Sequence, residues 1–114
     1  GSIIGNCTSA TVSTEWSYLD WPVSSADLEK LRGVRFVFPS GSHALEIDGV
    51  ELLENGKVIA RDRHAGLAGK PSRGNFYKLS LPKGIHANNG CSLRARVRSV
   101  GGKSSNGKLE LIKE

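Results

Sequence analysis

One stretch of the chain decides the fold class: Val50-Glu51-Leu52-Leu53-Glu54-Asn55-Gly56-Lys57-Val58-Ile59-Ala60. Two apolar runs flank Asn55-Gly56 in this stretch. An Asn-Gly pair tolerates the positive φ that a type I′ turn needs at both of its central positions. The sequence therefore predicts a tight β-hairpin over residues 50–60.

Apolar residues that alternate with polar ones predict further short strands on both sides of this hairpin. Between residues 92 and 100, Leu93, Ala95 and Val97 are expected to point inward while the intervening arginines point outward. About seven or eight short strands with regular turns are typical of an all-β sandwich, here a single jelly-roll-like antiparallel one. One further strand is expected in each of the segments 3–22, 34–38, 44–47, 76–81 and 108–112.

The rest of the chain adds one helical signal and one long loop. Residues 24–33 predict one or two helical turns, with a serine cap at the start and Gly33 at the end. The glycine-rich segment 62–75 predicts a loop. A length of 114 residues suits one domain. Gly1-Ser2 resembles the remnant of a removed tag, so we expect residues 3–114 to be a single β-sandwich domain excised from a larger protein.

The net charge of +5 raises the question of an anionic partner. Arg94, Arg96 and Arg98 share one side of their expected strand. They form either a solvated strand face or a groove for an acidic glycan or nucleic acid. We favour the solvated face and expect no nucleic-acid partner, because no aromatic residues interleave with the arginines. No apolar stretch reaches the roughly 20 residues that cross a bilayer, so membrane insertion is not expected.

The sequence contains no recognised catalytic motif, and we expect a non-catalytic domain. The serines lack a Gly-x-Ser-x-Gly context. Glu46, Asp48 and Glu51 are interpreted as surface acids rather than as the two carboxylates that glycosidases place across a cleft. Cys7 and Cys91 are either one disulfide of an exported protein or two free thiols, and both alternatives stay open.

The residues of this chain fit the binding of a sugar or of a metal ion better than they fit catalysis. Sugar binding needs flat aromatic faces beside polar groups, and each clustered tryptophan is alternatively a core residue. His64 either bonds a ligand or pins its own glycine-rich loop. For a structural calcium ion, the candidate ligands are Glu51 and Asp62, unless Asp62 closes the loop through backbone N–H groups. The candidate carbohydrate-binding residues are Trp16, Tyr18, Trp21, His43 and His64. By the two-residue period of a strand, Trp16 and Tyr18 share one face and Trp21 points the other way.

An ordered series of short motifs runs through most of the chain, roughly from residue 34 to residue 112. The series comprises the run from Phe36 to Leu52, Asn55-Gly56-Lys57, Asp62-Arg63-His64-Ala65-Gly66-Leu67-Ala68-Gly69, Asn75-Phe76-Tyr77-Lys78-Leu79, Leu93-Arg94-Ala95-Arg96-Val97 and the turn from Gly101 to Gly107. It resembles accessory β-sandwich domains of Bacteroidetes glycoside hydrolases, most of all those attached to family 20 β-hexosaminidases. One departure is Ser104-Ser105, where such domains usually read Asp-Ser.

The resemblance implies an accessory module of an exported glycosidase, at a secreted, periplasmic or cell-surface location. Its partner is then a glycan or the adjacent catalytic domain of the same polypeptide. The expected function is carbohydrate binding, and the alternative is a structural module that braces the catalytic domain. The fold alone does not choose between these two.

Overall fold

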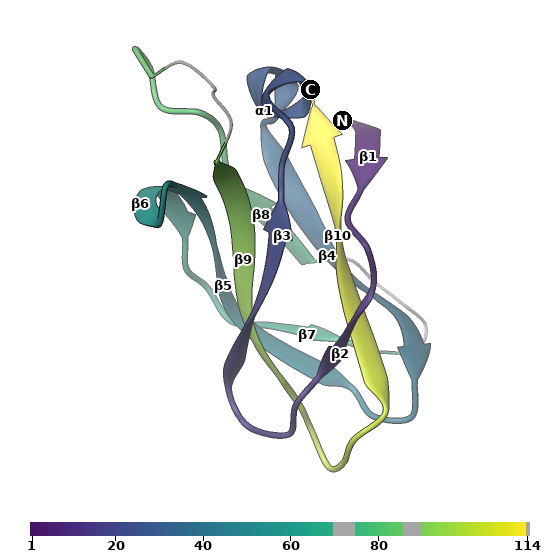
Figure 1. Ribbon diagram of the computed structural model, residues 1–114. Helices are drawn as coiled ribbons and strands as arrows, with labels where there is room; N and C mark the ends of the chain where they lie inside the picture. Colours follow the sequence, from purple (N-terminus) through teal and green to yellow (C-terminus); the bar gives the residue numbers. More distant parts are fainter. Residues whose placement is uncertain (70–74, 86–89, 114) are drawn as a thin grey trace.

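The computed structural model describes residues 1–69, 75–85 and 90–113, and these form two packed β-sheets with one short helix (Figure 1). The elements are β1 (Ser2–Asn6), β2 (Ala10–Val12), β3 (Ser17–Pro22), α1 (Ser25–Lys30), β4 (Gly33–Gly41), β5 (Leu45–Glu54), β6 (Lys57–Asp62), β7 (Gly66–Ala68), β8 (Asn75–Lys78), β9 (Cys91–Ser99) and β10 (Ser105–Lys113).

The strand order is that of a jelly roll. Sheet A has the order β1-β10-β4-β8, with β2 also pairing with β10, and sheet B has the order β3-β9-β5-β6, with β7 also pairing with β5. Strands from β2 to β5, and again from β8 to β10, alternate between the two sheets along the chain. Such crossing between two packed antiparallel sheets is the pattern of a jelly roll. The predicted all-β sandwich is confirmed.

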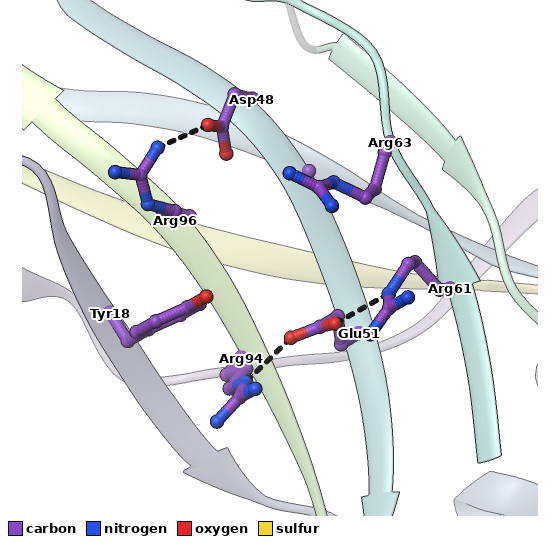
Figure 2. A pocket seen from close by; sticks show the side chains of 8 residues that line it. Tyr18, Asp48, Glu51, Arg61, Arg63, Arg94 and Arg96 are labelled. Atoms are coloured by element: carbon purple, nitrogen blue, oxygen red, sulfur yellow. Dashed lines mark hydrogen bonds and ion pairs between the residues drawn. The ribbon is translucent and has the colours of Figure 1, made fainter. Parts of the chain in front are cut away.

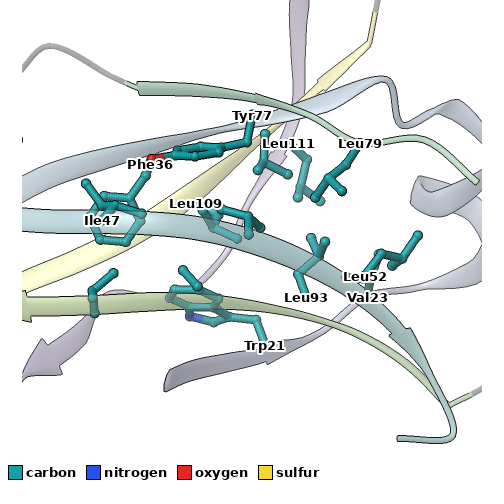
Figure 3. Close-up of a cluster of buried hydrophobic side chains, with 14 of the residues drawn as sticks. Trp21, Val23, Phe36, Ile47, Leu52, Tyr77, Leu79, Leu93, Leu109 and Leu111 are labelled. Atoms are coloured by element: carbon teal, nitrogen blue, oxygen red, sulfur yellow. The ribbon is translucent and has the colours of Figure 1, made fainter. Parts of the chain in front are cut away.

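The core lies between the two sheets and is filled by large apolar side chains from both (Figure 3). On β9, Leu93, Ala95 and Val97 are fully buried, as the alternation in the sequence predicted. Burial of such side chains is the main favourable term in the folding of a domain of this size. The largest members drawn in Figure 3 include Trp21, Phe36, Leu52, Tyr77, Leu93 and Leu109.

The hairpin and the helix form where the sequence placed them. Asn55 and Gly56 have φ values of 48° and 81°, and Glu54 pairs with Lys57 across this turn. Helix α1 begins after Ser24, whose hydroxyl accepts a hydrogen bond of 3.1 Å from the backbone N–H of Asp27. No helix in the described part of the chain is long and apolar enough to cross a membrane.

Gly33 has a different role from the predicted one. The helix ends at Lys30, and Gly33 is instead the first residue of β4. A Cβ atom at Gly33 would overlap the aromatic ring of Phe76 on the neighbouring strand β8. The glycine therefore lets this ring lie directly against the β4 backbone, which explains its presence better than helix termination does.

Several predicted strand boundaries were wrong. The segment 3–22 contains three strands rather than one, and two of them, β1 and β2, join sheet A. The strands expected on either side of Asp48-Gly49 are a single strand, β5, with an irregularity in its pairing between Ile47 and Gly49. The loop expected over residues 62–75 contains β7, and its residues 70–74 lie outside the described part of the chain.

Both cysteines are free thiols, so the disulfide alternative does not hold in this structure. Cys91 is buried at the start of β9, and Cys7 is half-buried after β1. Burial and the nearby carboxylate of Asp27 raise the pKa of Cys7 to about 11. The Cys7 thiol is therefore protonated at neutral pH, and this makes it a poor nucleophile.

Candidate functional site

The outer face of sheet B carries charged and aromatic side chains in parallel rows. Strand β9 contributes Arg94, Arg96 and Arg98, which point away from the core because side chains alternate along a strand. Its neighbour β5 contributes three carboxylates. On the other side, Tyr18 of β3 and Trp16 just before β3 contribute aromatic rings. The predicted arginine row is thus confirmed, and both flanks of it are occupied.

Each of these arginines is paired with a carboxylate of β5. Arg98 lies 3.1 Å from Glu46, and Arg96 hydrogen bonds to Asp48. Arg94 Nε donates to Glu51 over 2.7 Å. Because each arginine of the row has a carboxylate partner, the row by itself is not the open cationic groove that a polyanion requires.

Glu51 is the most buried carboxylate on this face, with 8% exposure. It binds Arg94 with one oxygen and Arg61 of β6 with the other, at 2.7 and 2.6 Å. Burial by itself raises the pKa of Glu51, but the hydrogen bonds and charges of Arg94 and Arg61 outweigh it, so the pKa is lowered from its ordinary 4.5. The hydrogen bond to Glu51 in turn raises the pKa of Arg94. Glu51 is therefore ionised and fixed in place.

A β-bulge explains how Glu51 reaches this face. With strict alternation, residues 46, 48 and 50 of β5 would point the same way. The pairing with β9 shifts between Ile47 and Gly49, so that Glu46 opposes Arg98 while Glu51 opposes Arg94. A bulge of this kind moves the following residues to the other face. It turns Val50 into the core and Glu51 outward beside Asp48.

Two aromatic rings stack on the arginines, one from Tyr18 of β3 and one from Trp16 just before β3, and neither contact was predicted. The guanidinium carbon of Arg94 lies 4.3 Å from the ring centre of Tyr18. The corresponding carbons of Arg96 and Arg98 lie 4.8 and 4.9 Å from a ring of Trp16. These are cation–π contacts. The expectation that no aromatic residue interleaves with the arginines was wrong, because the rings come from the adjacent strand and not from β9 itself.

A shallow hollow opens in the middle of this face (Figure 2). Its volume is about 160 Å³. Figure 2 shows the hydroxyl end of Tyr18 and the guanidinium of Arg63 directed toward the space between β9 and β5. Arg61 and Arg63, which lie at and just beyond the end of β6, were not among the predicted site residues. The residues that line the hollow are Tyr18, Asp48, Gly49, Glu51, Arg61, Arg63, Arg94 and Arg96.

The five predicted sugar-binding residues are only partly brought together. Trp16 and Tyr18 lie on the outer face of sheet B, as their shared parity predicted. Trp21 points the other way and is a core residue with 5% exposure, and its indole N–H donates to the carbonyl of Thr8 over 2.7 Å. The inclusion of Trp21 in a binding surface was therefore wrong, since its ring is not accessible to a ligand.

The two histidines lie away from this face. The backbone N–H of His43 donates to Ser105 Oγ at 3.0 Å, and its ring packs against Gly102. The ring of His64 stacks on Tyr77 with centroids 4.1 Å apart, and Nδ1 of His64 lies 2.9 Å from Asp62. These contacts fit the alternative in which His64 pins its own loop. Neither histidine lines the hollow beside Tyr18.

Glu51 and Asp62 do not form one cation site. Glu51 is occupied by two arginines. Asp62 accepts a hydrogen bond of 2.7 Å from the backbone N–H of Lys78 and contacts His64. The side chain of Asp62 lies on the opposite side of β6 from its neighbour Arg61, which binds Glu51. Within the described ranges, no three or more histidine, cysteine, aspartate or glutamate side chains are grouped in a way that could hold a metal ion.

Asp62 instead links the end of β6 to β8. Its carboxylate joins the end of sheet B to β8 of sheet A through Lys78. Tyr77 completes this contact by donating its hydroxyl hydrogen to the carbonyl of His64 over 3.1 Å. Burial, together with the charges of Asp62 and Asp48, raises the pKa of Tyr77 to about 12. The tyrosine is therefore neutral and remains a hydrogen-bond donor.

The fold and this face define a class of molecule: a jelly-roll β-sandwich with aromatic, arginine and carboxylate side chains on one open sheet. No protein-family model matches the chain, and a search of curated proteins gives no match either. Function is therefore inferred from the chemistry of the outer face of sheet B.

Proposed function

We propose that this domain is a non-catalytic carbohydrate-binding module whose ligand lies on the outer face of sheet B. The observation that carries the proposal is the arrangement of Tyr18 and Trp16 as aromatic platforms on an open sheet, directly beside fixed polar groups. A sugar ring offers apolar C–H faces and hydroxyl groups, and this surface has a counterpart for each.

The Tyr18 ring is placed to stack on a sugar. The guanidinium of Arg94 covers one face of the ring, yet 48% of the residue is exposed. The exposed area therefore lies on the other face and at the edges of the ring. An aromatic side chain that is held from behind in this way loses little rotamer freedom when a ligand binds, which lowers the entropic cost of binding.

The polar groups around the ring are also fixed before a ligand arrives. Glu51 is held between two arginines, and Asp48 is held by Arg96. Carboxylates accept hydrogen bonds from sugar hydroxyls, while guanidinium groups donate to hydroxyl and ring oxygens. A network that is already ordered serves orientation and specificity better than flexible side chains do.

The resemblance to accessory domains of glycoside hydrolases supports the same function and supplies a context. In that context the domain belongs to an exported glycosidase, and its role is to hold the catalytic domain near its polymeric substrate. No step of hydrolysis is assigned to the residues of this chain.

A matched pair of substitutions tests the proposal. Tyr18 and Phe76 are exposed to nearly the same extent, 48% and 45%, but they lie on different sheets. In a glycan-array screen of the purified domain, we expect Tyr18→Ala to weaken binding by about tenfold or more, which corresponds to about 1.4 kcal/mol. Phe76→Ala is expected to bind as the wild type does. Equal losses in both variants, or no binding by the wild type, would contradict the proposal.

A bracing role is the second candidate, and one observation favours it. Phe76 borders a hollow of about 340 Å³ on sheet A that is surrounded by basic side chains, including Arg35 and Lys78. Aromatic residues and arginine are both enriched at protein interfaces. In a polypeptide that joins this domain to a catalytic domain, bracing predicts one joint thermal transition that Phe76→Asp splits in two. Independent melting of the two domains before any substitution would exclude it.

A further inference from the structure

The hollow on the outer face of sheet B has a surplus of positive charge. Four arginines and two carboxylates line it, so the arginines exceed the carboxylates by two. Arg61 and Arg94 both form ion pairs with Glu51, and Arg96 forms an ion pair with Asp48. The remaining arginine, Arg63, forms no side-chain hydrogen bond or ion pair with any residue that the structure describes.

The side chain of Arg63 packs against Gly49, which has no side chain to displace it. The Cγ atom of Arg63 lies 3.2 Å from the place that a Cβ atom of Gly49 would occupy. Gly49 follows Asp48 in the bulge of β5 and is buried at the floor of the hollow. The stem of Arg63 therefore lies against β5 at this glycine. Figure 2 shows its guanidinium directed toward the side on which Asp48 and Arg96 lie.

Two of the paired arginines add donors to the same space. Arg61 and Arg94 each bind Glu51 through Nε. Both residues line the hollow, and their terminal amino groups donate no hydrogen bond to a residue that the structure describes. A guanidinium presents its N–H groups as a planar fork that matches the two oxygens of a carboxylate or the oxygens of a sulfate group. The hollow is thus rich in donors for an oxyanion.

We propose that this hollow binds the oxyanion of an acidic sugar, either the carboxylate of a uronic acid or a sulfate ester, with Arg63 as its principal ligand. The inference deepens the proposed carbohydrate-binding function and rests on it. The sugar ring that carries the oxyanion stacks on the exposed face of Tyr18, which lines the same hollow. Asp48 and Glu51 do not repel the anion strongly, because arginines neutralise both.

The first arm of the test uses inorganic sulfate as the probe. Sodium sulfate is titrated into ¹⁵N-labelled protein at constant ionic strength, and the arginine Nε–Hε signals are followed in the wild type, Arg63→Ala and Arg32→Ala. Arg32 is the matched control, an exposed arginine beside sheet A whose guanidinium donates to the carbonyl of Leu31 at 2.9 Å. We expect sulfate to shift the Arg63 signal, and Arg63→Ala to abolish the shifts of Arg61 and Arg94 that persist in Arg32→Ala.

The second arm compares neutral, uronic-acid and sulfated oligosaccharides on the same three proteins. We expect acidic glycans to bind about tenfold more tightly than neutral ones, and Arg63→Ala alone to remove this preference. A preference for carboxylate over sulfate, or the reverse, identifies the source of the oxyanion. Neutral glycans bound as tightly as acidic ones would overturn the inference and leave the proposed function standing. Sulfate shifts without binding of any glycan would contradict the sugar ligand and the proposed function together.

Discussion

At the scale of single residues, Glu51 organises the outer face of sheet B. It is the only carboxylate with two arginine partners among the ion pairs of the described residues. It is also more buried than Glu46 or Asp48. An ionised group in this position is stable only while both partners remain, because a buried charge without a partner is costly. Stability and site geometry therefore depend on the same side chain.

The lowered pKa of Glu51 predicts how stability changes with pH. A carboxylate whose pKa is lower in the folded state contributes stability above its ordinary pKa of 4.5, and this contribution is lost as the pH falls through the folded-state pKa. We expect Glu51→Gln to lower the free energy of unfolding at pH 7 by about 1–3 kcal/mol. The difference from wild type is expected to shrink as the pH falls below 4.5 and through the folded-state pKa of Glu51. Urea unfolding of both proteins across this range measures it.

Glu110→Gln is the matched control for this prediction. Glu110 pairs with Arg35 on sheet A at 3.2 Å, and that pair is more exposed. Exposed pairs contribute about 0–1 kcal/mol, so Glu110→Gln is expected to change stability little at any pH. A Glu51→Gln variant as stable as the wild type at pH 7, or a difference that grows toward acid pH, contradicts this interpretation of Glu51.

The direction in which a side chain points was easier to predict than the residues that it contacts. Alternation alone placed Arg94, Arg96 and Arg98 outward and their neighbours inward. The same parity put Trp16 and Tyr18 on one face and Trp21 on the other, and the structure agrees. The stacking of the rings on the arginines requires β3 to pair with β9, which lies more than 70 residues later in the sequence. Nothing local to either segment indicates that pairing.

At the scale of elements, the hairpin shows how far local sequence determines structure. Asn55-Gly56 correctly predicted the turn, but the pairing between β5 and β6 shifts between Leu52 and Leu53. Regular pairing from the turn would place Ala60 opposite Glu51. The shift places Arg61 there instead. Arg61 and Arg63 were missed because bulges on both sides of the hairpin decide which residues reach the site.

The hairpin turn itself gives a prediction about backbone strain. Gly56 has φ of 81°, and a Cβ atom there would meet no other atom within 4 Å. Gly56→Ala is therefore expected to cost about 1–2 kcal/mol through the backbone conformation alone. Chemical denaturation measures the loss.

Gly5→Ala provides the comparison for the hairpin variant. Its Cβ atom would make only ordinary contacts, the nearest of them at 3.6 Å to Leu111. We expect this variant to unfold at nearly the same urea concentration as the wild type. Similar losses at both positions would show that positive φ is not the cause of the strain at Gly56.

At the scale of the whole molecule, the class of fold was predictable and the shape of the site was not. Short alternating strands with frequent turns indicate a two-layered all-β domain, and the jelly-roll order confirms it. The sequence pattern placed Trp16 and Trp21 on opposite faces, but it did not indicate which of these faces is the core. That distinction depends on which sheet covers each ring, and this is set by long-range packing rather than by local pattern.

The location of a bound sugar decides whether the outer face of sheet B is the ligand-binding surface. The measurement is a map of backbone amide chemical-shift changes as the best-binding oligosaccharide from the glycan screen is titrated into ¹⁵N-labelled protein. We predict that the chemical-shift changes are concentrated in β3, β9 and the bulged part of β5, around Tyr18, Arg94 and Gly49. Changes concentrated in β1, β10, β4 and β8 of sheet A, or no changes at saturating sugar, would contradict it.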